Sequence, residues 1–310
     1  MSSTGITWRA LGSALFLVLG VVASQAGEPV TFCAYNLKNW LVMESPGGSK
    51  RPPQSKPDAE KQKVIEFLSE IQPDILGVCE IGTREDLQEL QSRLKDAGMD
   101  LPHSEFNQGA DVTRSLALLS RFPISARHHQ GALPYQIGGE TFFFQRGILD
   151  ATVDIRPDFQ VRFLGVHLKS KREVAEGDQA LMRRNEAHLT RAHLDKIFSL
   201  QSRPNLVLYG DFNEYRNESS MDEIIGSRAQ ESYMLEIPVK DSHGLLWTHF
   251  WDVADVYSRL DYLFVSRNLR PLVDTKKSRI HTSADFDKAS DHRPVVLNFE
   301  APQASAGEGR

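Results

Sequence analysis

Short apolar runs of strand length recur along nearly the whole chain, and they constrain its fold more than any other feature. Three longer segments interrupt them, with apolar side chains at helical spacing over residues 58–71, 83–95 and 175–198. No linker divides the chain, and no fixed-period repeat appears. The predicted strands cover residues 30–35, 75–78, 116–119, 142–153, 161–166, 206–209, 260–265 and 295–299.

This order of elements predicts an α/β (α+β) fold, a four-layer sandwich of two packed, mainly antiparallel β-sheets flanked by helices. Sheets and helices each need an apolar partner for their inward faces, and this arrangement supplies one to every layer. We expect one domain over residues 28–300, and we expect Gly210 to end the strand before it. The third helix should carry its apolar face on Leu181, Leu189, Leu194 and Ile197.

The first 26 residues differ from the rest. Arg9 precedes an apolar run at residues 11–23, and small residues follow up to Ala26, which is the pattern of a secretory signal cleaved near Ala26. An uncleaved membrane anchor is the alternative, but a span needs about 20 apolar residues and this run is shorter. We therefore expect an exported protein, periplasmic or extracellular, without stable membrane insertion. Residues 301–310 read as a disordered tail.

Charge and cysteine content limit the partners and the covalent links of the chain. It has 36 Lys and Arg against 41 Asp and Glu. A mildly acidic protein holds nucleic acid only through a local basic patch. Cys33 and Cys79 both lie in apolar runs. Export permits a disulfide, but buried free cysteines fit equally well.

Polar side chains stand at the ends of the predicted strands. Taken singly, Asp-x-Asn after glycine is a common turn, His167 fits a core histidine, and Asp261 fits a partner of Arg259. Loop polarity alone would not return to strand ends so often, and loops on a rigid scaffold are where catalytic groups are found. The set is Asn36, Glu80, His167, Lys169, Asp211, Asn213, Asp261, Asp291 and His292.

This set of residue types suits hydrolysis at phosphorus. Oxygen ligands without cysteine favour a hard cation, Mg²⁺ or else Mn²⁺ or Ca²⁺. A histidine beside a buried acid is a general-base pair, because the acid fixes the ring tautomer and stabilises the imidazolium. Amides and a lysine near a cation suit the oxygens of a phosphate group. Together these parts predict metal-assisted attack of water on a phosphate ester.

The motifs, in order, resemble the endonuclease/exonuclease/phosphatase (DNase I-like) superfamily. They are AYNLKNW, GVCE, LALLSRFPI, GVHLKSK, YGDFNE, RLDYLFVS and SDHRPV, and they span nearly all of the chain after the signal. GDFN, RLDY and SDHRP in this order are highly specific together. The superfamily includes DNase I-like nucleases, apurinic endonucleases, neutral sphingomyelinases and inositol polyphosphate 5-phosphatases. The resemblance implies a two-sheet α/β sandwich, as the order of elements does.

The resemblance also implies a metal side and a base for the site. Glu80 matches the acid that carries the divalent metal, with Asn36 beside it and Asp291 as a further metal-side carboxylate. His292 matches the histidine that activates water or stabilises the phosphate. Asp261 is its orienting partner.

Further roles follow for the phosphate. Asp211 and Asn213 match the pair that positions the nucleophile and the phosphate oxygens. His167 resembles a second histidine that assists the leaving oxygen. The planar fork of an arginine suits phosphate, so Arg114 or Arg146 could bind a phosphate oxygen. A surface ion pair is an equal alternative role for each of them. The candidates for binding the substrate phosphate are Lys169, Arg114 and Arg146.

The chain departs from the superfamily pattern in three places. Cys79 stands where a glutamine commonly precedes the metal-binding glutamate. Lys38 stands where some nucleases have an acid, which weakens a two-metal assignment. No cluster of basic and aromatic residues for gripping DNA is evident; Lys50, Arg51 and Lys56 are candidates, but a solvated loop is the better interpretation. We interpret His128 and His129 as surface residues rather than a zinc site.

The expected function is an exported, divalent-metal-dependent phosphoesterase, a monomer that uses His-activated water. A phosphodiesterase of the nuclease type comes first, with nucleic acid as the substrate. The alternatives are a lipid phosphodiesterase similar to sphingomyelinases and a phosphatase for small phosphate esters. A catalytically silent module that binds a phosphorylated ligand is the rival from another class, but the set of buried polar groups speaks against it.

Overall fold

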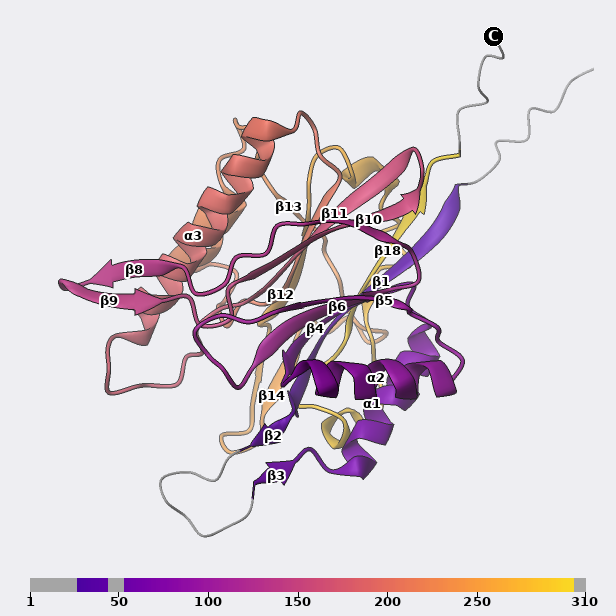
Figure 1. Ribbon diagram of the computed structural model, residues 1–310, viewed down its shortest axis with the longest axis horizontal. Helices are drawn as coiled ribbons and strands as arrows, with labels where there is room; N and C mark the ends of the chain where they lie inside the picture. The colour runs from indigo at the N-terminus through magenta and orange to yellow at the C-terminus, as the bar shows by residue number, and fades with distance from the viewer. Residues whose placement is uncertain (1–26, 44–52, 304–310) are drawn as a thin grey trace, which may run out of the picture.

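The computed structural model describes residues 27–43 and 53–303, so the predicted signal peptide and most of the basic loop at 47–57 lie outside the described residues. Within these ranges two six-stranded sheets form the centre of the protein (Figure 1). The strand orders are β17-β18-β1-β4-β6-β5 and β13-β16-β12-β11-β10-β7. Each sheet contains one parallel pair, β1 with β4 and β11 with β12, and its other neighbours are antiparallel.

The first sheet consists of β1 (Glu28–Trp40), β4 (Ile75–Ile81), β5 (His103–Asn107), β6 (Ser115–Ser120), β17 (Arg279–Ile280) and β18 (Val295–Ala301). The second consists of β7 (Ile124–Arg127), β10 (Ile148–Arg156), β11 (Phe159–His167), β12 (Leu206–Asp211), β13 (Leu235–Glu236) and β16 (Asp261–Val265). Three two-stranded ribbons pair β2 (Val42–Met43) with β3 (Gln54–Ser55), β8 (Pro134–Ile137) with β9 (Glu140–Phe143), and β14 (His249–Trp251) with β15 (Val256–Ser258). The helices are α1 (Asp58–Ile71), α2 (Arg84–Asp96), α3 (Gln179–Leu200) and α4 (Ser219–Ile225), with short 3₁₀ turns η1 (Arg270–Leu272) and η2 (Phe286–Lys288).

The sheets pack face to face through an apolar core and carry helices on their outer faces. Phe32 of the first sheet lies 4.9 Å, ring centre to ring centre, from Phe163 of the second and 4.8 Å from Tyr209. A second apolar cluster joins the first sheet to α1 and α2, and a third joins the second sheet to α3 and α4. Figure 1 shows α1 and α2 on one side of the sheets and α3 on the other. The four-layer sandwich predicted from the sequence is therefore confirmed.

Several predicted elements are confirmed in detail. The apolar spacing over residues 58–71 forms α1 with these bounds. The helix predicted over residues 83–95 is α2, which Thr83 caps: its hydroxyl accepts from the backbone N–H of Asp86, and the Asp86 carboxylate accepts from the N–H of Thr83. The cysteines also have a clear place: Cys33 belongs to the cluster beneath α1, whereas Cys79 faces the other sheet. Because they lie on opposite faces of the first sheet, both are free and no disulfide joins them.

The strand predicted over residues 142–153 is wrong in one respect, because it is two strands. β9 ends at Phe143 and β10 begins at Ile148. Gly147 turns the chain with φ +68°, and a Cβ there would lie 2.1 Å from the carbonyl oxygen of Gln130. The break therefore places Arg146 outside the ladder, at the edge of the site described below.

The prediction that Gly210 ends its strand is also wrong. β12 continues through Gly210 to Asp211, and Gly210 is paired with both neighbouring strands. Its φ is +135°, and a Cβ there would lie 1.9 Å from the carbonyl oxygen of Val166. Glycine is required because the strand must pass this close to β11.

The helix predicted from residue 175 and the tail predicted from residue 301 need smaller corrections. Asp178 caps α3, so the helix begins at Gln179. Leu181 is exposed, and Met182, Glu186, Leu194 and Ile197 are among the side chains that face the sheet instead. Ala301 is fully buried at the end of β18, opposite Glu28. The short helix α4 had no counterpart among the predictions.

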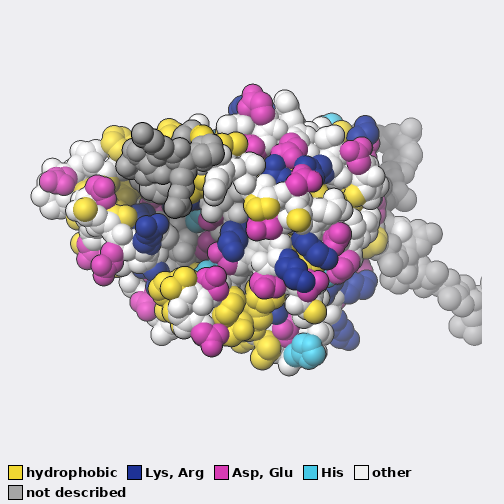
Figure 2. Space-filling view, turned by 90° about the horizontal axis from the view of Figure 1, so that it is seen from below, with side chains coloured by type: hydrophobic (Ala, Val, Ile, Leu, Met, Phe, Trp, Pro, Cys, Tyr) yellow, Lys and Arg dark blue, Asp and Glu magenta, His cyan; other side chains and the backbone are white. Residues whose placement is uncertain are grey.

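None of the described helices is both long enough and apolar enough to span a membrane. On the face shown in Figure 2, Lys and Arg side chains alternate with Asp and Glu, and apolar patches lie between them. The described part of this face therefore carries no continuous basic surface.

Candidate active site

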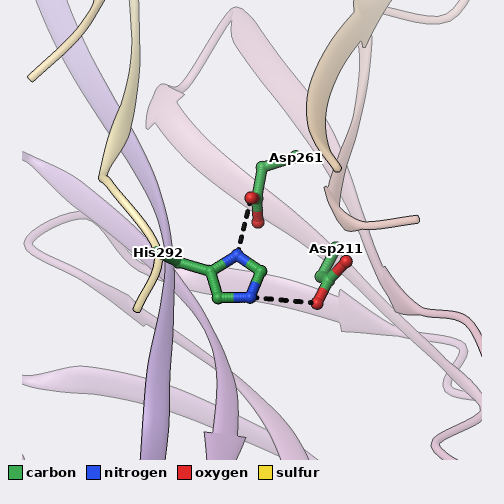
Figure 3. Close-up of side chains that lie close together, drawn as sticks. All are labelled: Asp211, Asp261 and His292. Atoms are coloured by element: carbon green, nitrogen blue, oxygen red, sulfur yellow. Dashed lines mark hydrogen bonds and ion pairs between the residues drawn. The ribbon is translucent and has the colours of Figure 1, made fainter. Parts of the chain in front are cut away.

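His292 and Asp261 form the predicted acid–histidine pair (Figure 3). The ring Nδ1 of His292 lies 2.7 Å from Oδ2 of Asp261, and both side chains are buried. Asp261 opens β16, where its backbone N–H donates to the Thr248 hydroxyl at 3.0 Å. Arg259, the alternative partner, binds Glu236 instead. A carboxylate on Nδ1 leaves Nε2 free to accept a proton.

Asp211 stands on the other side of that imidazole. Its Oδ2 lies 3.6 Å from Nε2 of His292 and 3.5 Å from Nε2 of His167 (Figure 3 shows the first contact). Strand register explains the grouping, because Asp211 is paired directly with His167 on β11 and with Asp261 on β16. Asn213 supports the acid: its N–H donates to Oδ1 of Asp211 at 2.9 Å, and its amide donates to the carbonyl of Leu168.

Glu80 and Asn36 come from the first sheet and close the site. Both pairings of β4 shift register between Cys79 and Ile81, so Glu80 sits on a bulge with φ +64°. A bulge re-aims a side chain, and a non-glycine residue in this conformation is a recurrent feature of functional sites. Nδ2 of Asn36 lies 3.3 Å from Oε1 of Glu80 and 3.0 Å from Oδ2 of Asp211. Residues from both sheets therefore meet at one point.

The pKa values of three groups reflect this crowding. Burial, and then the Asp261 and Glu80 carboxylates, raise the pKa of Asp211 to about 7 against the lowering effect of His292. Burial alone would lower the pKa of His292, but the Asp261 and Asp211 carboxylates outweigh it and hold that pKa well above its usual value. Burial, followed by the charges of Arg146, His292 and Arg114, holds the pKa of His167 well below its usual value. His167 is therefore neutral.

The residues present fit a hard divalent cation. Carboxylates of Glu80, Asp211 and Asp261 converge, and burial, with a smaller contribution from the charges of Asp261 and Glu80, raises the pKa of Asp211 to about 7. Glu80 is not closely ion-paired within the described part of the chain, where Nε of Arg114 lies 3.9 Å from its Oε2. Oxygen donors of this kind suit Mg²⁺, Mn²⁺ or Ca²⁺. Glu80 would hold such an ion on one side of Asp211. Asn36 would join it only with its amide turned, because its Nδ2 faces both carboxylates and its Oδ1 accepts from the N–H of Lys38 at 3.1 Å.

A second grouping of ligand atoms has to be weighed. Asp211, Asp261 and His292 each offer an atom within 4.8 Å of the others and could hold a metal ion. An ion bound there through Nδ1 would break the 2.7 Å hydrogen bond between His292 and Asp261, and one bound through Nε2 would occupy the ring nitrogen that faces Asp211. A cation at Glu80 would leave both ring nitrogens of His292 as they are.

Asp291 is not brought to the metal side by any described contact. Its Oδ1 lies 3.4 Å from the hydroxyl of Ser290, and its carbonyl accepts from the N–H of Phe250 on β14. Its charge acts on His292, whose pKa it raises further. The role of Asp291 as a further carboxylate for the metal stays a prediction.

Comparison with known proteins agrees with this geometry. The family model "Endonuclease/Exonuclease/phosphatase family" matches residues 42–292. This chain belongs to that family. Its members in general hydrolyse phosphoesters and typically use divalent metals. Among the curated proteins, nothing matches.

Solved structures share the fold at low identity. A Bacteroides vulgatus endonuclease/exonuclease/phosphatase is 17% identical with a TM-score of 0.60, covering 88% of this chain and 99% of that one. Truncated TDP2 from Caenorhabditis elegans is 17% identical with a TM-score of 0.56, covering 88% and 98%. A Staphylococcus aureus beta toxin is 13% identical with a TM-score of 0.57, covering 86% and 99%.

The basic side chains that lie around the site differ in their contacts. Nε of Arg114 donates to the side chain of Asn39 at 2.8 Å, beside Glu80. Arg146 and Lys169 are buried near His167. Lys56, a candidate for holding DNA that we interpret from the sequence as part of a solvated loop, is instead buried and ion-paired with Glu60 at 3.1 Å. Lys50 and Arg51 lie outside the described residues.

The interpretation of His128 and His129 as surface residues holds for the first only. His129 is half-buried, its Nδ1 accepts from the N–H of Asp150, and its Nε2 lies 3.1 Å from Glu105. It ties β5 to β10 and has no part in the site.

Sequence reasoning missed the residues that hold the catalytic ones. Ser290 donates to the carbonyl of Asn36 and accepts from the N–H of His292, which joins β1 to the last loop. The spacing Ser-x-His was its signal, since serine commonly bonds the backbone two residues on. Thr248, which holds the start of β16, and Glu186, a fully buried acid of α3, gave no such signal.

The orienting role of Asp261 makes a prediction about pH. As a base, His292 must be neutral, so the acidic limb of kcat/KM against pH follows its pKa. Asp261 raises that pKa. Asp261→Asn should therefore move the limb to lower pH by about one unit or more, and lower the plateau because the tautomer is no longer fixed. Kinetics between pH 5 and about 9 measure this.

Asp252→Asn is the control, because it removes the same charge from an exposed position on the neighbouring ribbon. A limb that stays in place in Asp261→Asn, or moves to higher pH, contradicts the pairing.

Proposed function

We propose that this chain is an exported, divalent-metal-dependent phosphodiesterase of the nuclease type. The observation that carries the proposal is the buried His292–Asp261 pair at 2.7 Å with Nε2 turned toward Asp211, next to Glu80. A histidine held at Nδ1 and facing a second acid at Nε2 suits activation of water. The oxygen-rich cluster beside it suits a cation that stabilises charge on phosphorus.

In this mechanism each residue has a distinct task. Nε2 of His292 takes the proton of the attacking water, and Asp261 stabilises the imidazolium that results. Asp211 orients that water. The neutral His167 lies 3.5 Å from Asp211 and donates toward the leaving oxygen. A divalent ion, held by Glu80 and, with its amide turned, by the oxygen of Asn36, would polarise the phosphoryl oxygen.

Lipid phosphodiester cleavage is a second candidate, and a specific surface favours it. The ribbon β14–β15 exposes 52% of Trp251, 82% of Val253 and 53% of Tyr257. It adjoins the site, since the N–H of Phe250 donates to the carbonyl of Asp291 at 2.8 Å. Exposed apolar surface beside a catalytic centre is typical of enzymes that meet lipids or partners.

The cellular location and the oligomeric state of the protein are part of the same proposal. The leader pattern up to Ala26 supports export to the periplasm or the outside, and we infer a monomer.

The experiment is a substrate screen with the purified chain lacking residues 1–26. Mg²⁺, Mn²⁺ and Ca²⁺ are tested with plasmid DNA, RNA, sphingomyelin vesicles and bis-p-nitrophenyl phosphate. We expect bis-p-nitrophenyl phosphate and DNA to be cleaved, and DNA cleavage to weaken steeply as salt rises, because phosphate contacts release counterions. Cleavage of sphingomyelin alone would favour the lipid enzyme, and no turnover of any substrate would contradict both candidates.

A further inference from the structure

Two cations beside the site are buried without adequate partners. Arg146 and Lys169 are each 8% exposed. Nη2 of Arg146 lies 3.2 Å from Oδ2 of Asp111, but its Nε has no hydrogen-bond partner. Among the described residues, Nζ of Lys169 has one hydrogen-bond partner, the Ser170 hydroxyl at 3.5 Å. An ionised group is costly to bury unless it is paired. Lys169 therefore lacks an anion among the described residues, whereas Arg146 has Asp111 but keeps an unused donor at Nε.

One buried carboxylate holds the two cations together. Oε1 of Glu186 accepts from the backbone N–H of Gln145 at 2.9 Å, and Oε2 accepts from that of Lys169 at 2.6 Å. Glu186 is fully buried, so the segment before β10 and the segment after β11 are fastened to the same point of α3. Arg146 follows the first anchored amide, and Lys169 carries the second. Glu186 is thus a positioning residue for both.

Glu186 contacts neither cation through its carboxylate oxygens, although its charge acts on both from a distance. Both of its oxygens are engaged by backbone amides, and no described ion pair joins it to Arg146 or Lys169. Burial, opposed first by the N–H of Gln145, raises its pKa to about 7, which weakens its charge further.

The two cations lie next to the reacting centre but outside it. His167, two residues before Lys169, contacts Asp211 and Glu80 through Nε2 at 3.5 and 4.0 Å. Among the described residues, neither Arg146 nor Lys169 forms an ion pair with Glu80, Asp211 or Asp261. Both charges nevertheless act on His167. An anion bound by them would therefore sit beside the phosphate that reacts.

We propose that Arg146 and Lys169 form a second anion subsite that binds a phosphate group adjacent to the one being hydrolysed. The proposal rests on the proposed function and makes it more specific. The substrate then carries at least two phosphates, as an oligonucleotide does and sphingomyelin does not. A guanidinium and an ammonium suit this ligand, because charge-assisted hydrogen bonds to phosphate are roughly twice as strong as neutral ones.

Direct binding tests the subsite without relying on turnover. Isothermal titration calorimetry of the chain lacking residues 1–26, with Mg²⁺ present, compares thymidine 3′,5′-bisphosphate with the 3′- and 5′-monophosphates. We expect the bisphosphate to bind at least about tenfold more tightly than either monophosphate. Arg146→Met or Lys169→Met should reduce this ratio to about two.

Arg184→Met is the matched control, because it removes a positive charge from the exposed side of α3 and should leave the ratio unchanged. If Arg146→Met fails to fold, as judged by circular dichroism, the milder Lys169→Gln carries the comparison. Equal affinities of the wild type for the three ligands would overturn the proposal. So would variants that weaken all three ligands equally, because the cations would then bind the reacting phosphate itself.

Failure of the subsite and failure of the proposed function are distinguishable. Hydrolysis of bis-p-nitrophenyl phosphate without a preference for the bisphosphate would refute the subsite alone. A preference for the bisphosphate without any hydrolysis would refute the catalytic proposal alone.

Discussion

Replacing His292 with alanine should lower kcat for bis-p-nitrophenyl phosphate by about 10²–10⁴, the contribution of a positioned general base. The imidazole is the group that stands between Asp261 and Asp211, at 2.7 and 3.6 Å. No other described side chain forms an ion pair with both of these acids. Steady-state rates at saturating substrate and Mg²⁺ measure the loss.

His188→Ala is the control for this experiment, since His188 lies exposed on α3 and should have wild-type rates. The thermal unfolding midpoint of His292→Ala shows whether its fold survives, because the change leaves the buried Asp261 without its ring partner. A folded His292→Ala enzyme that keeps more than about a tenth of the wild-type kcat would contradict the role of base.

Removing divalent metal should have the second largest effect. Excess EDTA should lower the rate at least about a hundredfold, because a bound cation supplies several kcal/mol of charge stabilisation in the transition state. Added Mg²⁺ should restore it. Glu80→Gln should need much more Mg²⁺ for half-maximal activity, because Glu80 provides the carboxylate on the metal side. Activity measured against free Mg²⁺ concentration gives both results.

Glu85→Gln is the matched control, an exposed acid near the start of α2 whose loss should leave the Mg²⁺ requirement unchanged. Activity that persists undiminished in excess EDTA would rule out the cation from the mechanism. A Glu80→Gln enzyme with the wild-type Mg²⁺ requirement would place the ion elsewhere.

The layers of this fold could be predicted from the sequence because they depend on local patterns. Apolar spacing defined α1 with its observed bounds and α2 to within one residue at each end. The failures occur where backbone geometry overrides the pattern. Gly147 breaks a run that the sequence predicts as one strand, whereas Gly210 continues a strand that the sequence predicts to end there. The local sequence does not distinguish Gly147 from Gly210. The difference lies in the carbonyl oxygen that approaches each one, that of Gln130 at Gly147 and that of Val166 at Gly210.

The sequence predicts which residues form the candidate site but not how their side chains are arranged. Polar residues at strand ends identified Asp211, Asp261 and His292, and parallel and antiparallel register then brings them together. The bulge that aims Glu80 depends on pairing with both neighbours of β4. Glu186 reads as one more acid on a polar helix face. Its role arises from two amides 41 and 17 residues away in the chain, a contact that no spacing rule contains.

The position of a bound Mn²⁺ ion tests most directly whether His292 is the base and Glu80 the metal ligand. Crystals soaked in Mn²⁺ and measured for anomalous scattering would locate it independently of any activity. We expect an anomalous peak for Mn²⁺ at the carboxylate of Glu80, with the hydrogen bond between His292 and Asp261 intact. A peak bound instead by His292 together with Asp211 and Asp261 would make that histidine a metal ligand and would contradict its role as the base.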